Sequence, residues 1–130
     1  MTISYNPDKI KILVIDDDDV IRLTMQSFLK KKGFQVFTAE NGNTGLELFK
    51  KESPQIIITD MLMPNKEGLE TITEIRSFKN GSKIIAMSGG GSTQNMTFLQ
   101  LAEKVGADLL LSKPVKPDQL IAAIEDLLGS

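Results

Sequence analysis

Five short apolar runs alternate with helical patterns along this 130-residue chain, and this alternation restricts the fold more than any other feature. The runs lie at 12–15, 34–38, 56–59, 83–87 and 109–111. Most of them are apolar at nearly every position, as expected for parallel strands that are covered on both faces. The repeated strand–helix unit therefore predicts an α/β fold with helices on both faces of a parallel sheet.

The helical patterns follow the strands at 20–29, 44–51, 66–78, 93–105 and 120–128. In the first pattern, apolar residues recur at the i, i+4 and i+8 spacing of one helix face. Asp18 or Asp19 can cap this helix, and Gly33 follows its lysine-rich last turn, where a helix commonly stops. We therefore expect five helices, one after each strand.

The connections between these units leave few topologies. Right-handed crossovers favour a doubly wound, flavodoxin-like sheet with strand order 2-1-3-4-5, in which strands 1 and 3 meet at the switch point. Gln35 makes the second run the least apolar, which suits an edge strand. No linker or low-complexity stretch interrupts the pattern. We therefore expect residues 1–130 to form a single domain.

The chain contains no histidine and no cysteine. The lack of cysteine excludes disulfides and thiolate nucleophiles, and the lack of both residues excludes ordinary zinc sites. No imidazole is available as a general base, so Ser-His-Asp and Cys-His catalysis are excluded. Any bound metal should be a hard cation held by oxygen atoms, such as Mg²⁺ or Ca²⁺.

The formal net charge is −2, and no basic cluster suggests a surface for nucleic acid or for an anionic membrane. The first nine residues lack the charged and apolar regions of a signal peptide. No apolar run approaches the roughly 18 residues that span a bilayer. We therefore expect a cytoplasmic protein that contacts neither nucleic acid nor membrane directly.

Polar side chains collect where the predicted strands end. Four aspartates at 16–19 follow the first strand, Asp60 ends the third, Ser88 ends the fourth and Lys113 follows the fifth. The carboxyl ends of parallel strands meet at one edge of the sheet, where sites form at the switch point. We therefore expect these side chains to share one cleft. Taken alone, the aspartate run could instead serve only as a helix cap.

Carboxylates about 4 Å apart repel by several kcal/mol near a protein surface, so a cation must offset them. Mg²⁺ is the natural candidate because it takes oxygen ligands and keeps open positions, which phosphoryl transfer requires. Asp60 is then the candidate nucleophile, since carboxylates form acyl phosphates. Lys113 and the hydroxyl of Ser88 would contact phosphoryl oxygens.

These motifs together resemble the receiver domain of two-component response regulators, over residues 9–128. The resemblance rests on the order and spacing of four segments: Ile12-Leu13-Val14-Ile15-Asp16-Asp17-Asp18, Asp60-Met61-Leu62-Met63-Pro64 with Gly68, Met87-Ser88-Gly89, and Ser112-Lys113-Pro114-Val115. It implies a signalling domain that catalyses its own aspartyl phosphorylation, and not an enzyme acting on a separate substrate.

The resemblance also implies a role for each site residue. Asp60 would accept a phosphoryl group from a sensor histidine kinase or a phosphotransfer protein. Mg²⁺ would be held by Asp60, directly by Asp17, through water by Asp16, and by the main-chain carbonyl of Leu62.

Further roles follow from the same resemblance. Lys113 would pair with a phosphoryl oxygen, the Lys113–Pro114 bond would be cis, and Ser88 would be a switch hydroxyl. The switched face would run from the 83–87 strand to the final helix and would control an effector domain, a partner or a homodimer. Met96, Phe98 and Leu110 are apolar candidates for that face.

The chain departs from common receivers at three positions. Leu110 stands three residues before the lysine, where an aromatic residue is usual. Leu62 and Gly90 stand where many receivers carry polar side chains, and neither can orient an attacking water. We therefore expect slow self-dephosphorylation.

Three other functions fit parts of the pattern. Asp16 and Asp18 look like the Asp-x-Asp start of haloacid-dehalogenase-type phosphatases, with Asp16 as nucleophile and Asp18 as acid/base, but this leaves Asp60 unexplained. A flavin carrier shares the fold, but four aspartates would repel the flavin phosphate that such a loop must hold. A pure interaction module would not need the acidic, hydroxyl and lysine side chains that this sequence carries at the strand ends.

Overall fold

The computed structural model describes residues 6–61, 67–78, 81–89 and 106–129. Its elements follow one another as η1 (Pro7–Lys9), β1 (Lys11–Ile15), α1 (Asp19–Lys31), β2 (Gln35–Ala39), α2 (Gly42–Glu52), β3 (Ile56–Asp60), α3 (Glu67–Ser77), β4 (Lys83–Ser88), β5 (Leu109–Ser112) and α5 (Pro117–Leu128). The helix expected at 93–105 lies outside the described residues. No helix within the described part of the chain is long and apolar enough to cross a membrane.

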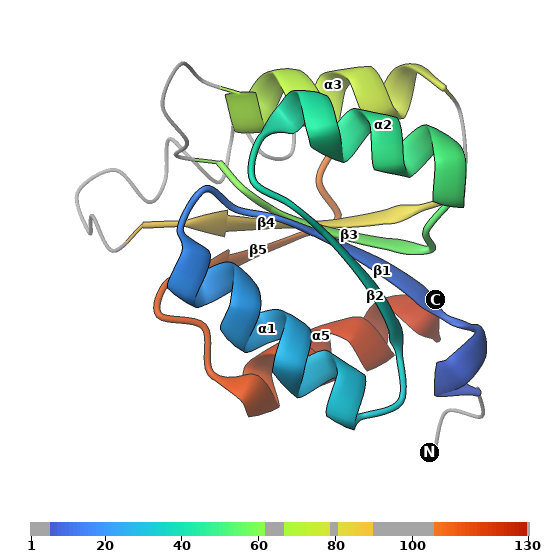
Figure 1. The fold of residues 1–130 in the computed structure, drawn as a ribbon, viewed down its shortest axis with the longest axis vertical. Helices are drawn as coiled ribbons and strands as arrows, with labels where there is room; N and C mark the ends of the chain where they lie inside the picture. Colours follow the sequence, from blue (N-terminus) through green and yellow to red (C-terminus); the bar gives the residue numbers. More distant parts are fainter. Residues whose placement is uncertain (1–5, 62–66, 79–80, 90–105, 130) are drawn as a thin grey trace.

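The five strands form one parallel sheet in the order β2-β1-β3-β4-β5, which confirms the predicted topology. In Figure 1, α2 and α3 cover one face of the sheet, and α1 and α5 cover the other. The second strand lies at an edge, as Gln35 suggested. Strands β1 and β3 are adjacent, so the residues that follow them meet at the same edge of the sheet.

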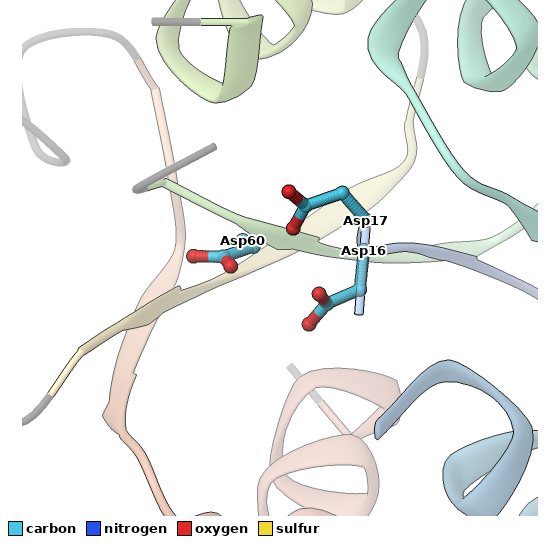
Figure 2. Close-up of side chains that lie close together, drawn as sticks. All are labelled: Asp16, Asp17 and Asp60. Atoms are coloured by element: carbon cyan, nitrogen blue, oxygen red, sulfur yellow. The ribbon is translucent and has the colours of Figure 1, made fainter. Parts of the chain in front are cut away.

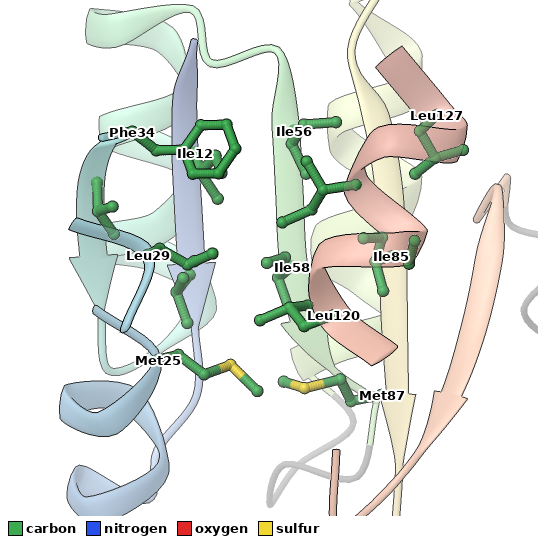
Figure 3. Packing of buried hydrophobic residues seen from close by; sticks show 14 residues of the cluster. Ile12, Met25, Leu29, Phe34, Ile56, Ile58, Ile85, Met87, Leu120 and Leu127 are labelled. Carbon is green, nitrogen blue, oxygen red and sulfur yellow. The ribbon is translucent and has the colours of Figure 1, made fainter. Parts of the chain in front are cut away.

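The core lies on both sides of the three central strands. In β1, residues 12–15 are fully buried, and the isoleucines of β3 and β4 are buried equally well. On one face, Met25 and Leu29 of α1 and Leu120 and Leu127 of α5 pack against the sheet (Figure 3). Because helices cover both faces of the central strands, the residues of these strands are apolar in a run and do not alternate between apolar and polar.

The second face is covered by α2 and α3. Phe49 of α2 and Ile72 and Ile75 of α3 pack against Leu13 and Ile15 of β1, together with isoleucines of β3 and β4. Ile72 and Ile75, three residues apart in this helix, are fully buried.

Several element ends differ from the sequence-based prediction for local reasons. Helix α2 begins at Gly42 and not near Thr44, because the side chain of Asn41 accepts the Thr44 amide at 2.8 Å and caps the helix. Strand β2 begins one residue later than predicted. The amide of Phe34 still bonds the carbonyl of Leu29 at the end of α1. Gly33, with φ of 100°, makes the turn between them.

The close approach of α2 to β1 depends on Gly45. A Cβ at this position would lie 2.5 Å from Cδ1 and 2.9 Å from Cγ1 of the buried Ile15. We expect Gly45→Ala to lower the free energy of unfolding in urea by about 1–3 kcal/mol, the usual cost of overpacking. Gly81→Ala is the matched control, because nothing lies within 4 Å of its Cβ. Equal stability of the two variants would contradict this prediction.

Candidate functional site

The strand register places the acidic residues of two strands side by side. In the pairing of β1 with β3, Ile15 lies opposite Thr59. One further step along the sheet brings Asp16, the first residue after β1, to the level of Asp60, the last residue of β3. The buried pairing of β1 with β3 therefore fixes the main-chain positions of both aspartates.

Three carboxylates converge at this edge. Asp16, Asp17 and Asp60 each place an oxygen atom within 4.8 Å of the other two, and Figure 2 shows the three side chains gathered at the ends of their strands. Asp16 is fully buried and Asp60 is 5% exposed, whereas Asp17 is open to solvent. A set of carboxylate oxygens with one open side fits a hard cation such as Mg²⁺.

Lys113 joins two of these carboxylates from the loop that follows β5. Its Nζ atom donates to Oδ2 of Asp60 at 2.7 Å and to Oδ2 of Asp16 at 3.1 Å. The main-chain amide of Lys113 donates to the carbonyl of Ser88 at 2.8 Å, and the Lys113–Pro114 bond is cis. The lysine is thus anchored to β4 while its charge lies between β1 and β3.

Burial and pairing act in opposite directions on these charges. Burial raises the pKa of Asp16, although the amide of Asp18 and the ammonium group of Lys113 act to lower it. Burial alone would lower the pKa of Lys113, but its hydrogen bonds to Asp60 and Asp16 outweigh that effect and the pKa rises. One ammonium group faces three carboxylates, so the site keeps an excess of negative charge that a bound cation would offset.

The four aspartates at 16–19 divide into two pairs with different contacts. Asp18 caps α1, because its side chain accepts the amides of Val20 and Ile21 at 2.9 and 3.2 Å. Asp19 pairs with Arg22 at 2.5 Å. The capping interpretation is therefore right for Asp18, while Asp16 and Asp17 lie in the carboxylate cluster.

The remaining predicted residues are placed as follows. Ser88 is the last residue of β4 and is almost fully buried. Asp60 lies opposite Met87 in the register, so Ser88 stands one step beyond the carboxylate on the neighbouring strand. Leu62, Gly90, Met96 and Phe98 lie outside the described residues.

Arg22 was not identified from the sequence. Its Nη1 atom donates to the main-chain carbonyl of Asp16 at 2.9 Å. The spacing of Asp19 and Arg22, three residues apart at the start of a helix, was the available signal, because such residues are neighbours on a helix surface.

Comparison with known proteins identifies the family. The family model of the response regulator receiver domain matches residues 12–125. The chain is 30% identical over 118 residues to the chemotaxis protein CheY of Halobacterium salinarum, covering 91% of this chain and 96% of that protein. It is 36% identical over 120 residues to the probable transcriptional regulator ycf27 of Galdieria sulphuraria, covering 92% of this chain but only 46% of the regulator.

Solved structures agree with these relatives. A response regulator receiver domain protein from Clostridium thermocellum superposes with a TM-score of 0.81 and 34% identity, covering 92% of this chain and 94% of that one. The order of the strands, the match to the family model over most of the sequence and these relatives agree with one another. The chain therefore belongs to the response regulator receiver domain family.

Proposed function

We propose that residues 1–130 form one receiver domain of two-component signalling and that Asp60 is its phosphoacceptor. The observation that carries this proposal is the position of the Asp60 carboxylate. It contacts the ammonium group of Lys113 at 2.7 Å and shares a carboxylate cluster with Asp16 and Asp17 at the switch point of the sheet. Family membership supports the same assignment.

In the proposed reaction, a carboxylate oxygen of Asp60 attacks the phosphorus atom of a phosphohistidine. An O–P bond forms and the N–P bond breaks, and the imidazole leaves with the electron pair and takes a proton. Lys113 pairs with a phosphoryl oxygen as the negative charge moves toward Asp60. This sequence contains no histidine, so the donor histidine belongs to a kinase or phosphotransfer protein outside these residues.

Asp16, Asp17 and Asp60 would hold Mg²⁺, with the main-chain carbonyl of Leu62 as a further ligand. The metal would supply positive charge for the phosphoryl oxygens. Asp17 is the exposed member of the three, so a hydrated ion would reach the site from the solvent on the side of Asp17. We also propose a cytoplasmic location for the domain, together with the kinase or phosphotransfer protein that would phosphorylate Asp60.

The proposed output is a two-state change on the face from β4 to α5. Ser88 is almost fully buried at the end of β4, one step from Asp60, and a phosphoryl group would draw its hydroxyl inward. Leu110 packs against the core layer under α2 and α3. A bias of a few kcal/mol is enough to shift such an equilibrium toward a state that an effector domain or partner binds.

The proposed function is tested by incubating the protein with acetyl phosphate, with and without Mg²⁺, and measuring the intact mass. We expect the gain of one phosphoryl group only when Mg²⁺ is present. The phosphorylated form should then decay slowly, because neither Leu62 nor Gly90 can orient a water molecule. An unchanged mass in Mg²⁺ would rule out the phosphoacceptor assignment.

A groove beside the site suits the docking of the phosphohistidine protein. The groove has a volume of about 550 Å³ and is lined by Val20, Ile21, Thr24, Met25, Lys113, Pro114 and Val115. Lys113 belongs to both the groove and the carboxylate cluster. A partner that delivers a phosphoryl group to Asp60 would therefore contact the groove next to Lys113. Val20 is 74% exposed and Leu23 is 54% exposed on the same helix, which offers such a partner apolar surface.

Val20→Gln should therefore slow phosphoryl transfer from a protein donor without slowing phosphorylation by acetyl phosphate. The substitution removes an exposed apolar contact, and the loss of an interface contact that matters for binding costs more than about 1 kcal/mol. Transfer is measured from a phosphorylated histidine phosphotransfer protein that labels the wild type. Phe78→Gln is the control, because Phe78 is 50% exposed and directly follows α3, the helix that covers the other face of the sheet (Figure 1). Equal transfer rates for both variants would argue against this docking surface.

A further inference from the structure

The side chain of Arg22 reaches back from the second turn of α1 to the end of β1. Its Nη1 atom donates to the main-chain carbonyl of Asp16 at 2.9 Å, and its Nη2 atom pairs with Oδ1 of Asp19 at 2.5 Å. The side chain is only 13% exposed. An arginine with a forked donor thus links the main chain of the acidic loop to the first turn of the helix.

The bonded carbonyl belongs to the peptide that connects Asp16 to Asp17. A peptide unit is planar, so fixing the direction of its carbonyl also fixes the position of the next Cα atom. The amide of Asp16 is already bonded to the carbonyl of Ala39 at 3.1 Å. Together these bonds hold the main chain on both sides of the Asp16 Cα atom and set where the Asp17 side chain begins.

Asp17 depends on this main-chain anchor more than its neighbour does. The carboxylate of Asp16 is held by the amide of Asp18 at 2.9 Å and by Lys113 at 3.1 Å. Among the described residues, no hydrogen bond or ion pair to the exposed carboxylate of Asp17 is observed. Its place in the carboxylate cluster therefore follows from the direction of the main chain.

We propose that Arg22 is a positioning residue that orients Asp17 for metal binding. The inference rests on the proposed function of the carboxylate cluster as a Mg²⁺ site. The guanidinium charge itself would oppose a cation, but the carboxylate of Asp19 offsets it at 2.5 Å. Arg22 therefore contributes geometry to the site without adding uncompensated positive charge.

The chain offers a matched control in Arg76. This residue donates to the main-chain carbonyls of Gly106 and Ser82, each at 2.7 Å, and pairs with Asp108 at 2.6 Å. It lies near the amino ends of β4 and β5, because Asp108 also accepts the amide of Ile84. Arg76 thus makes the same kinds of contact at the edge of the sheet opposite to the site.

The experiment compares Arg22→Met, Arg22→Lys and Arg76→Met with the wild type. Mg²⁺ affinity is measured directly by calorimetric titration, and thermal unfolding is followed without metal. We expect Arg22→Met to bind Mg²⁺ about tenfold more weakly, as is typical when a partner that orients a metal ligand is lost. The Mg²⁺ concentration for half-maximal phosphorylation by acetyl phosphate should rise equally, while the rate at saturating Mg²⁺ stays near the wild-type rate.

The conservative variant and the control separate positioning from stability. Arg22→Lys keeps the charge but lacks the fork, so we expect an intermediate affinity. Arg76→Met should lower the melting temperature and leave Mg²⁺ affinity unchanged. Wild-type affinity in Arg22→Met, or in Arg22→Lys if the methionine variant does not fold, would overturn the role of Arg22. A wild type that binds no Mg²⁺ would instead remove the proposed function on which this inference rests.

Discussion

Asp60→Asn should abolish the gain of a phosphoryl group from acetyl phosphate and Mg²⁺, as measured by intact mass. The amide has nearly the same shape as the carboxylate but has no anionic oxygen to form an acyl phosphate. Removing a nucleophile typically lowers such a rate by several orders of magnitude. The variant should still fold, because Lys113 keeps its contact with Asp16 at 3.1 Å.

Asp16→Asn is the informative comparison for this result. Asp16 is buried and bonded to Lys113, so its loss should weaken Mg²⁺ binding and slow phosphorylation without removing the acceptor. A phosphatase that used Asp16 as nucleophile would behave in the opposite way, since it would lose its covalent intermediate in Asp16→Asn and keep it in Asp60→Asn. Phosphoryl labelling of Asp60→Asn at the wild-type rate would therefore exclude Asp60 as the acceptor.

The centre of the fold could be predicted from the sequence because its strands are buried on both faces. A run such as 12–15 has no polar position, as expected for a strand that helices cover on both faces. The ends of elements depend on single side chains, such as the Asn41 cap, that apolar periodicity does not reveal. Val20 belongs to the apolar spacing of the first helix, but it is 74% exposed in the structure. Periodicity identifies the apolar face of a helix but does not show where the sheet beneath that helix ends.

The site could be predicted in outline for a topological reason. Parallel strands bring their carboxyl ends together, so Asp60 and the aspartates after β1 had to approach one another. Apolar periodicity alone did not separate the four aspartates, because they have the same side chain and all lie within three residues of the start of α1. The cap was left open between Asp18 and Asp19, and the structure assigns it to Asp18, while Asp16 and Asp17 lie in the carboxylate cluster as the family resemblance implied.

Lys113→Met should destabilise the metal-free protein by about 2–3 kcal/mol in urea unfolding. Methionine keeps much of the alkyl stem but leaves Asp16 and Asp60, which are 0% and 5% exposed, without their shared counter-charge. Breaking a buried ion pair by removing one partner costs roughly 3–5 kcal/mol. The lysine side chain is 18% exposed, so solvent screening reduces this cost.

The pH dependence of this difference has a definite sign. The pKa of Lys113 is raised in the folded protein above its ordinary value of 10.5. Its charged form therefore contributes stability that is fully present below pH 10.5 and is lost as the pH rises through the higher folded-state pKa. The gap between wild type and Lys113→Met should therefore close in strongly alkaline solution, and it should also shrink in acid, where the Asp16 carboxyl group, whose pKa burial raises, becomes protonated.

A double variant separates loss of the counter-charge from loss of packing. Asp16→Asn removes one of the two buried carboxylates that Lys113 neutralises, so Lys113→Met should cost less in the Asp16→Asn background than in the wild type. Mg²⁺ should also restore stability to Lys113→Met, because a bound cation supplies the missing positive charge and favours the folded state by mass action. If Lys113→Met costs the same in both backgrounds and Mg²⁺ restores nothing, the lysine stabilises the site through its alkyl stem and not through its charge.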